Sequence, residues 1–370
     1  MTKATNKIPS PPRIPVFGNA HQVAGKDLVL KMLKVIGDYS PICEFKMIND
    51  KMLMISNHEL AEGILNSPHC HKAIPKPLQQ IRNFAKDGLF TAWTDEPNWK
   101  KAHNILMPGF GRTAIMGYLP IMVDRVNELM NYWRTNSAGQ WVDVQNDMTK
   151  LTFEVIGRCG FDYSFGCFDG TEQHSFLGAM DFALNESFQR AMLPSVMHKM
   201  RVKKAKKYWK DIDFMFDLVD GIIQNRRANP DPSKIDFLNL MLHSKDAETG
   251  EYLDDENIRY QIITFLIAGH ETTSGLLSFA FYELLRNKTY LKKAKTEAEE
   301  FLKNGTDDLT IKDMGRLTFI RKFLMETLRL HPPVFGFAMY ADKDMVVDNY
   351  PVKKDQIINI ISYYINRDKK

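Results

Sequence analysis

The sequence of 370 residues predicts a mainly α-helical protein with a small β region. Apolar residues recur at helical spacing through most of residues 99–330, whereas alternating apolar and polar residues occur in residues 42–56 and 340–362. No linker or internal repeat separates these regions, so we expect a single domain over residues 1–370. The composition, with 44% hydrophobic and 25% charged residues, is typical of a globular protein, and the net charge of +4 is too small to indicate nucleic-acid binding.

Short elements are expected near the amino terminus. The proline-rich residues 8–19 favour extended chain and turns, and apolar residues at helical spacing predict a helix over residues 28–35. Residues 42–56 alternate in polarity and contain the turn pair Asn49-Asp50, which predicts a hairpin. These residues form the first part of the expected β region.

Long helices are expected in the middle of the chain. Residues 254–287 favour one helix that is capped by Asp254 and about 50 Å long. The last expected helix, residues 320–330, ends before Pro332, since proline disfavours the helical conformation at the preceding residue. An earlier helix ends in a breaker-rich loop at residues 229–232, and its apolar stripe consists of Ile212, Met215, Phe216, Val219, Ile222 and Ile223.

A polar group interrupts the longest expected helix. Residues 262–267 are apolar almost all round, which indicates a buried helix, and Gly269, Glu271 and Thr272 follow them. A threonine hydroxyl can bond a carbonyl of its own helix and bend it, so one interpretation is a kinked core helix. We favour a second interpretation, a groove that holds a small ligand beside a hydroxyl and an acid, because carboxylates rarely enter a buried helix for packing.

Several other patterns are weaker. His270-Glu271 begins a zinc-protease pattern, but Ser274 stands where the second histidine is required. Gly109 and Gly111 resemble a dinucleotide-binding fingerprint, but they follow a helical pattern instead of a strand. The basic residues 199–210 favour a solvated helix face, with docking of an acidic partner as the minor alternative.

The cysteines and the amino terminus predict a cytoplasmic location. The four cysteines form no C-x-x-C pair and are too few for a disulfide framework, which favours a reducing compartment. The first ten residues contain no apolar signal-peptide core. No apolar stretch reaches the ~20 residues that a membrane-spanning helix needs, so we expect no membrane span.

Three motifs occur in one order along the chain. They are Trp99-x-x-x-His103, Ala268-Gly269-x-Glu271-Thr272-Thr273 and Glu326-x-x-Arg329, the last followed by His331-Pro332-Pro333. Together they resemble the cytochrome P-450 family of haem-thiolate monooxygenases, and most of all the haem domain of bacterial self-sufficient fatty-acid hydroxylases. The resemblance implies the mostly helical P-450 fold and an enzyme that inserts one oxygen atom from O2 into a small apolar substrate. It also implies haem as cofactor and electrons from NADPH, delivered by a flavoprotein reductase with FAD and FMN, fused or separate.

The resemblance implies roles for individual residues. Thr272 corresponds to the threonine that assists oxygen activation, and Glu271 to the neighbouring acid, which would relay protons. Glu326 and Arg329 correspond to a buried structural pair whose disruption would cost about 3–5 kcal/mol. The remaining residues are expected either to bind haem, namely Trp99, His103, Lys72, Ala268 and Gly269, or to line the substrate pocket, namely Phe90 and Val334.

Two positions leave the substrate open. In the fatty-acid hydroxylases an arginine and a tyrosine near the channel mouth hold the substrate carboxylate, and Asp50 and Met54 stand at these positions here. Because an aspartate repels a carboxylate, an uncharged or cationic apolar substrate is as compatible with the sequence as a fatty acid.

The family's haem ligand has no counterpart in this sequence. In the family a loop F-x-x-G-x-R-x-C-x-G follows the E-x-x-R helix, and its thiolate binds the iron. None of the four cysteines lies in such a loop, and Cys159, which precedes the long helix, is interpreted as a packing residue. We therefore expect an incomplete carboxyl end, with the haem ligand beyond Lys370 and no metal ligand within the chain.

This expectation leaves three hypotheses. The first is most of a haem monooxygenase that is inactive by itself, and the second is a haem-less remnant that at most binds an apolar ligand. The third is an enzyme completed by a separate chain. Absence of the last segments would expose Leu266 and Phe279, so we expect a poorly soluble or partly molten chain.

Overall fold

The computed structural model describes residues 6–23, 27–47, 50–170, 174–193, 201–306 and 309–368. The chain packs into two compact units, the first formed by Met1–Pro75 with Leu328–Lys370 and the second by Lys76–Thr327. The first unit thus joins residues from both ends of the sequence, while the second is continuous. The expected single domain over residues 1–370 stays a prediction.

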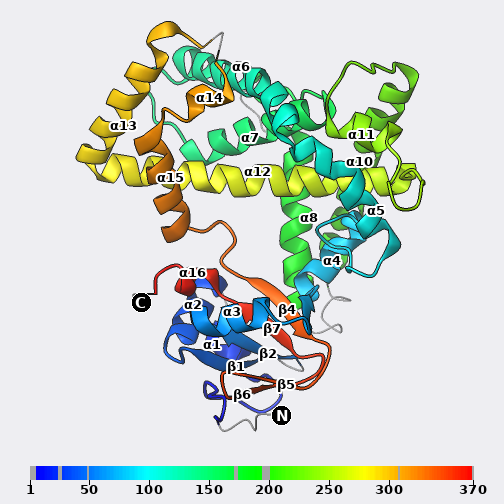
Figure 1. The fold of residues 1–370 in the computed structure, drawn as a ribbon, viewed down its shortest axis with the longest axis vertical. Coiled ribbons are helices and arrows are strands. Elements are labelled where there is room, and N and C mark those ends of the chain that lie inside the picture. The colour runs from blue at the N-terminus through cyan, green and yellow to red at the C-terminus, as the bar shows by residue number, and fades with distance from the viewer. Residues whose placement is uncertain are drawn as a thin grey trace. The chain divides into compact units, whose positions relative to one another are not determined.

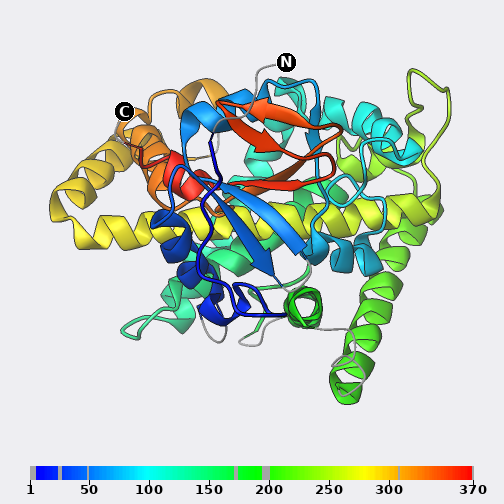
Figure 2. The same ribbon diagram turned by 90° about the horizontal axis from the view of Figure 1, so that it is seen from below.

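The first unit contains the β region (Figure 2). Its main sheet has the strand order β1-β2-β7-β4-β3, and β5 pairs with β6 in a separate two-stranded sheet. β2 is parallel to β7, so that residues 52–55 pair with residues 357–360, whereas the other neighbouring strands are antiparallel. The strands are β1 (Ile42–Met47), β2 (Asp50–Ile55), β3 (Cys70–Lys72), β4 (Phe337–Ala341), β5 (Met345–Val347), β6 (Tyr350–Val352) and β7 (Ile357–Ile360).

Short helices complete the first unit and help to bury its core. Met54 of β2 is buried in a cluster with Ile36 and Phe45, so it packs in the core of this unit. The side chain of Asp50, the other position expected at a substrate-channel mouth, lies outside the described residues. The helices are α1 (Ala20–Val23), α2 (Leu28–Gly37), α3 (His58–Leu65) and α16 (Ser362–Ile365).

The second unit is helical (Figure 1). Within the part of the chain that the structure describes, none of its helices, or of those in the first unit, is long and apolar enough to cross a membrane. Its helices are α4 (Lys76–Ala85), α5 (Pro97–Leu106), α6 (Arg112–Asn136), α7 (Val144–Phe161), α8 (Ser175–Met192), α10 (Val202–Ala228), α11 (Phe237–His243), α12 (Asp255–Arg286), α13 (Lys288–Phe301) and α14 (Ile311–Met314), with α15 (Thr318–Leu330) ending in the first unit.

Helix α12 corresponds to the predicted long helix. It forms over Asp255–Arg286, and the Asp254 side chain accepts a hydrogen bond from the backbone N–H of Asn257 at its start. The predicted exposure of Leu266 is wrong, because its side chain is 0% exposed in the main hydrophobic core, whereas Phe279 is 41% exposed. The apolar stripe predicted on α10 is buried as well, at Ile212, Met215, Val219, Ile222 and Ile223.

Three further patterns have structural roles. Gly109 lies in the short 3-10 helix Met107–Phe110, which leads into α6 and follows α5, so no strand precedes it. Cys159 is a buried residue of α7 that packs with Tyr118 and Ala114, in keeping with its predicted packing role. The basic run ends in the first turns of α10, and its first two residues lie outside the described residues.

The buried ion pair that the structure describes differs from the expected one. Glu326 and Arg329 are both exposed, and Thr327 is the buried residue of α15, since it stands on the opposite face of this helix. Arg226 of α10 instead binds the carboxylate of Asp236 in a bidentate pair, with N–O distances of 3.1 and 2.9 Å, and both side chains are buried. Buried charge therefore connects α10 to the start of α11.

Candidate functional site

The centre of α12 carries an acid and a hydroxyl next to each other. Thr272 is half-buried, and its Oγ1 donates a hydrogen bond to the carbonyl oxygen of Ala268 over 2.9 Å. Ala268 and Glu271 are exposed beside it, so this face of the helix is accessible. The helix is continuous from Asp255 to Arg286, and the predicted bond from a threonine hydroxyl to its own helix is present without a break in the helix.

Glu271 lies in an environment that disfavours its charged form. Although its side chain is exposed, the surrounding protein removes enough water to raise the pKa of Glu271, and the charge of Asp181 on α8 raises it further. A carboxyl with a raised pKa holds its proton closer to neutral pH than an ordinary glutamate does. Glu271 is therefore suited to store and release a proton beside Thr272.

Gly269 faces α7, on the side of α12 that is packed against the core. A Cβ atom built on Gly269 would lie 2.9 Å from Cγ1 of Ile156, which is closer than carbon atoms approach. Thr152 of α7 also donates a hydrogen bond to the carbonyl oxygen of His270 over 3.0 Å. The missing side chain thus allows α7 and α12 to approach closely, and its predicted contact with a cofactor stays a prediction.

The segment that carries Phe90 is attached to α12. The backbone N–H of Leu89 donates a hydrogen bond to Oε1 of Gln261 over 3.0 Å, and Gln261 lies about two turns before Ala268. Phe90 follows directly and is 39% exposed. Gln261 thereby positions this aromatic residue relative to α12.

Asp87 connects the starts of two helices. Its carboxylate accepts hydrogen bonds from the side-chain amides of Asn98 on α5, over 2.7 Å, and of Asn257 on α12, over 3.0 Å. Sequence reasoning missed Asp87, Asn257 and Gln261, since each is an ordinary polar residue in an apolar surrounding. The one available signal was the pair Asn257 and Gln261 at i, i+4, inside a helix that is otherwise apolar.

Trp99 and His103 share one face of α5, as their spacing predicts. Their rings stack with centroids 5.3 Å apart and an interplanar angle of 22°, and both are half-buried. Among the described residues neither ring nitrogen has a hydrogen-bond partner. Two N–H groups near solvent are therefore available to an anionic group.

The remaining predicted site residues belong to the first unit. Lys72 ends β3, where its backbone pairs with Met339 of β4. Val334 is 54% exposed, and its carbonyl oxygen accepts a hydrogen bond from Ser362 over 2.9 Å. Arg329 donates to the carbonyl oxygen of Asn366 over 2.6 Å. Their predicted roles stay predictions.

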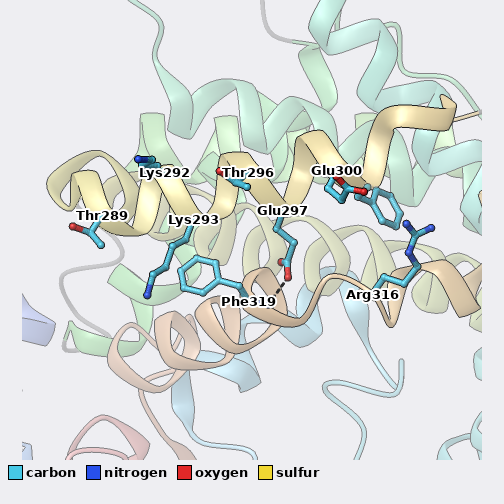
Figure 3. A pocket seen from close by; sticks show the side chains of 9 residues that line it. Thr289, Lys292, Lys293, Thr296, Glu297, Glu300, Arg316 and Phe319 are labelled. Atoms are coloured by element: carbon cyan, nitrogen blue, oxygen red, sulfur yellow. Dashed lines mark hydrogen bonds between the residues drawn. The ribbon is translucent and has the colours of Figure 1, made fainter.

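A surface groove of about 760 Å³ lies elsewhere in the second unit (Figure 3). It is lined by residues of α13 and by Arg316 and Phe319, and it contains none of the predicted site residues. Glu297 in this groove accepts hydrogen bonds from the backbone N–H groups of Phe319 and Ile320, each over 2.8 Å. Its carboxylate caps the start of α15, which is a structural role.

All four cysteines are buried and unpaired. Burial raises the pKa of Cys43 and of Cys159 to about 12, and it also raises the pKa of Cys70 and Cys167. The thiols are therefore neutral near pH 7. Since a thiolate is the form that binds metals, none of these cysteines is suited to be an axial haem ligand.

Comparison with known proteins identifies the family. A sequence profile described as Cytochrome P-450 matches residues 8–370. The chain therefore belongs to the cytochrome P-450 family, a family of haem-containing oxidoreductases, and its mainly helical fold with a small sheet region agrees with that family.

The similar proteins carry a reductase in their names. The chain is 42% identical, over 368 residues, to bifunctional cytochrome P-450/NADPH–P-450 reductase 2 of Bacillus subtilis, covering 99% of this chain and 35% of that protein. It is 41% identical to the bifunctional cytochrome P-450/NADPH–P-450 reductase of Bacillus cereus, covering 100% of this chain and 35% of that protein. A self-sufficient cytochrome P-450 monooxygenase of Phanerodontia chrysosporium is 37% identical, with coverage of 98% and 34%.

These comparisons confirm the predicted resemblance to the haem part of proteins that also contain a reductase. The chain spans about a third of the length of these curated relatives.

Proposed function

We propose that this chain forms the haem-binding part of a monooxygenase that inserts one oxygen atom from O2 into an apolar substrate. Electrons would come from NADPH through a flavoprotein reductase, as the names of the relatives suggest. The observation that carries the proposal is the acid and alcohol pair on α12. Thr272 bonds Ala268 on an accessible helix face, and the adjacent Glu271 has a raised pKa.

The residues of the second unit fit one side and one edge of a haem. Ala268 is exposed and presents a methyl group, which leaves room for a flat ligand against α12. Trp99 and His103 offer N–H donors without partners among the described residues, and such donors suit the propionates of haem. When bound through a thiolate, haem supplies the activation of dioxygen. The four cysteines do not fit that ligand role, so the proposal concerns the α12 side of the site.

Thr272 and Glu271 would manage water and protons. The Thr272 hydroxyl uses its hydrogen in the bond to Ala268, so its oxygen keeps lone pairs that can accept a hydrogen bond from a water molecule. Glu271 can hold a proton at its carboxyl and pass it to that water, because its pKa is raised. Together they would supply protons at a defined position and exclude random delivery from bulk water.

The substrate class that we propose is apolar. The side chain of Phe90 is 39% exposed on a segment anchored to α12 by Gln261, which supports a role in limiting how a substrate approaches. A fatty acid and an uncharged or cationic apolar molecule both fit this proposal. We further propose a cytoplasmic location, which the four unpaired cysteines support.

A chimera tests the proposal. This chain replaces the matching 368 residues of the Bacillus subtilis relative, so that the remainder of that protein supplies what lies outside the match. The reduced chimera should give a thiolate-type absorption band with carbon monoxide and should oxidise NADPH when apolar compounds are added. Replacement of Thr272 by alanine should raise the fraction of electrons released as hydrogen peroxide several-fold, because water is then no longer positioned.

Ser278→Ala is the matched control, since Ser278 donates the same type of bond to Ser274 of α12 over 2.7 Å. An equal peroxide fraction in the unaltered chimera, Thr272→Ala and Ser278→Ala would contradict the role of Thr272. Absence of the carbon monoxide band in a folded chimera would contradict haem binding itself.

A further inference from the structure

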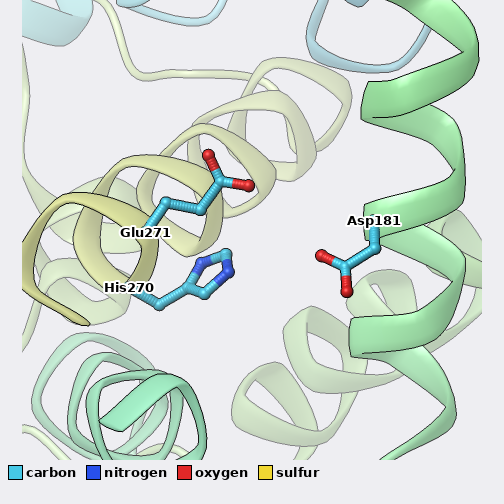
Figure 4. A group of neighbouring side chains, drawn as sticks. All are labelled: Asp181, His270 and Glu271. Carbon is cyan, nitrogen blue, oxygen red and sulfur yellow. The ribbon is translucent and has the colours of Figure 1, made fainter. Parts of the chain in front are cut away.

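Asp181, His270 and Glu271 bring three ligand-type groups together (Figure 4). An oxygen of each carboxylate and a ring nitrogen of His270 all lie within 4.8 Å of one another. His270 and Glu271 are consecutive residues of α12, while Asp181 comes from α8. The cluster is thus formed by the tertiary structure.

The hydrogen bond of His270 determines which nitrogen faces the carboxylates. Its Nδ1 lies 2.6 Å from the carbonyl oxygen of Leu266, and a carbonyl oxygen can only accept, so Nδ1 carries the hydrogen. In the neutral ring Nε2 therefore carries a lone pair. The side chain is 1% exposed, and no described residue forms a hydrogen bond with Nε2.

The two carboxylates are also unsatisfied. Among the residues that the structure describes, neither Asp181 nor Glu271 has an ion pair or a hydrogen bond to its side-chain oxygens. Three acceptors therefore face one another, one of them deeply buried, without a donor or a cation between them. Such an arrangement is costly, because buried acceptors lose water without gaining a partner.

We propose that Asp181, His270 and Glu271 bind a divalent transition-metal ion, with Zn²⁺ as the occupant, through Nε2 and one oxygen of each carboxylate. One imidazole nitrogen with two carboxylate oxygens is a donor set that Zn²⁺ accepts, and water would complete the coordination. The Leu266 carbonyl holds the imidazole from behind, as partners of metal-binding histidines commonly do.

The geometry needs only a small adjustment to close around an ion. Two ligand atoms at about 2.1 Å from zinc lie at most about 4.2 Å apart. The Glu271 side chain is exposed and the Asp181 side chain is half-buried, so rotation of either can shorten separations of up to 4.8 Å. An ion at this place would hold the Glu271 carboxylate, so the inference goes beyond the proposed oxygenase function and does not depend on it.

Equilibrium dialysis of the chain against Zn²⁺ tests the inference. We expect one tightly bound Zn²⁺ per chain, and at least tenfold weaker binding in both Asp181→Asn and Glu271→Gln. Asp213→Asn, which removes an exposed carboxylate of α10, is the matched control and should bind Zn²⁺ like the unaltered chain. Circular dichroism establishes that each variant is folded.

A second measurement uses the unaltered chain and does not depend on the folding of any variant. Electron paramagnetic resonance of one bound Cu²⁺ should show coupling to a single imidazole nitrogen. Coupling to several nitrogens, which surface histidines would produce, overturns the site, as does Zn²⁺ binding that neither carboxylate substitution weakens. Absence of Zn²⁺ binding, or binding of an alkylammonium ion at this cluster in preference to Zn²⁺, also overturns it.

Discussion

The hydroxyl of Thr272 donates a hydrogen bond to the carbonyl oxygen of Ala268, one turn earlier on α12, over 2.9 Å. This bond is local, so it connects α12 to no other element. Thr152, by contrast, donates from α7 to the carbonyl oxygen of His270 over 3.0 Å and joins two helices in the core. Two threonines near the same helical turn thus differ in what they hold together.

Replacement of these threonines should separate a site residue from a packing residue. Thr272→Ala should change the free energy of unfolding by less than about 1 kcal/mol, because alanine has the higher helix propensity and the lost bond is half-exposed. Thr152→Val should destabilise the chain by about 1 kcal/mol or more, since a buried bond between helices is lost. Urea unfolding measures both values, and equal losses would show that Thr272 is also a structural residue.

Gly269 should tolerate no larger side chain. Gly269→Ala should destabilise the chain by about 1–3 kcal/mol, because the added carbon would lie 2.9 Å from Ile156. Gly178→Ala on α8 is the control, since no atom lies within 4 Å of its added carbon, and it should be neutral or stabilising. In a double-mutant cycle Ile156→Ala should relieve the clash, and strictly additive effects would argue against direct contact.

The two consecutive arginines of α10 should differ strongly. Arg226→Gln leaves the carboxylate of Asp236 buried without its cation, and a loss of about 3–5 kcal/mol is expected. Arg227→Gln removes an exposed pair with Asp255 and should cost less than about 1 kcal/mol. Thermal and urea unfolding of the two variants test this, and similar losses would contradict the role assigned to burial.

Stability should fall with acid through His174. Its Nδ1 accepts a hydrogen bond from the backbone N–H of Phe176 over 3.1 Å at the start of α8, which requires the neutral ring, and desolvation lowers the pKa of His174 below 6.5. Because the pKa is lower in the folded chain, the unfolded chain binds more protons, so stability is present above pH 6.5 and is lost as pH falls below it.

His174→Asn keeps a capping acceptor and removes this titration. The free energy of unfolding, measured between about pH 7.5 and pH 5.5, should therefore fall less steeply in the variant than in the unaltered chain. Parallel pH profiles for the two chains would show that the protonation of His174 does not contribute.

The cysteines should behave as neutral thiols. With the pKa of Cys43 and Cys159 raised to about 12, iodoacetamide at pH 8 should leave the folded chain unmodified and should react after unfolding. For the same reason this chain, reduced and treated with carbon monoxide, should show no thiolate-type absorption band. Rapid alkylation of the folded chain, or such a band, would contradict the burial of the thiols.

Local features were predictable because they depend on neighbours in the sequence. Helix α12 was predicted over 254–287 and forms over Asp255–Arg286, since apolar periodicity and the Asp254 cap are properties of one segment. The stacking of Trp99 on His103 follows from their spacing within one helix. The expected buried pair of Glu326 and Arg329 was wrong in its exposure, because burial depends on what covers a helix face and not on spacing.

The sequence by itself determined the fold class, the family and the acid and alcohol on α12, because each is encoded in residues a few positions apart. Only the tertiary structure decided that Asp181 faces His270 and Glu271, that Gly269 serves the contact with α7, and that Asp87 joins the starts of α5 and α12. The physical reason is that hydrogen bonds and close packing act over a few ångströms in space. Which distant residues come that near depends on how the helices pack.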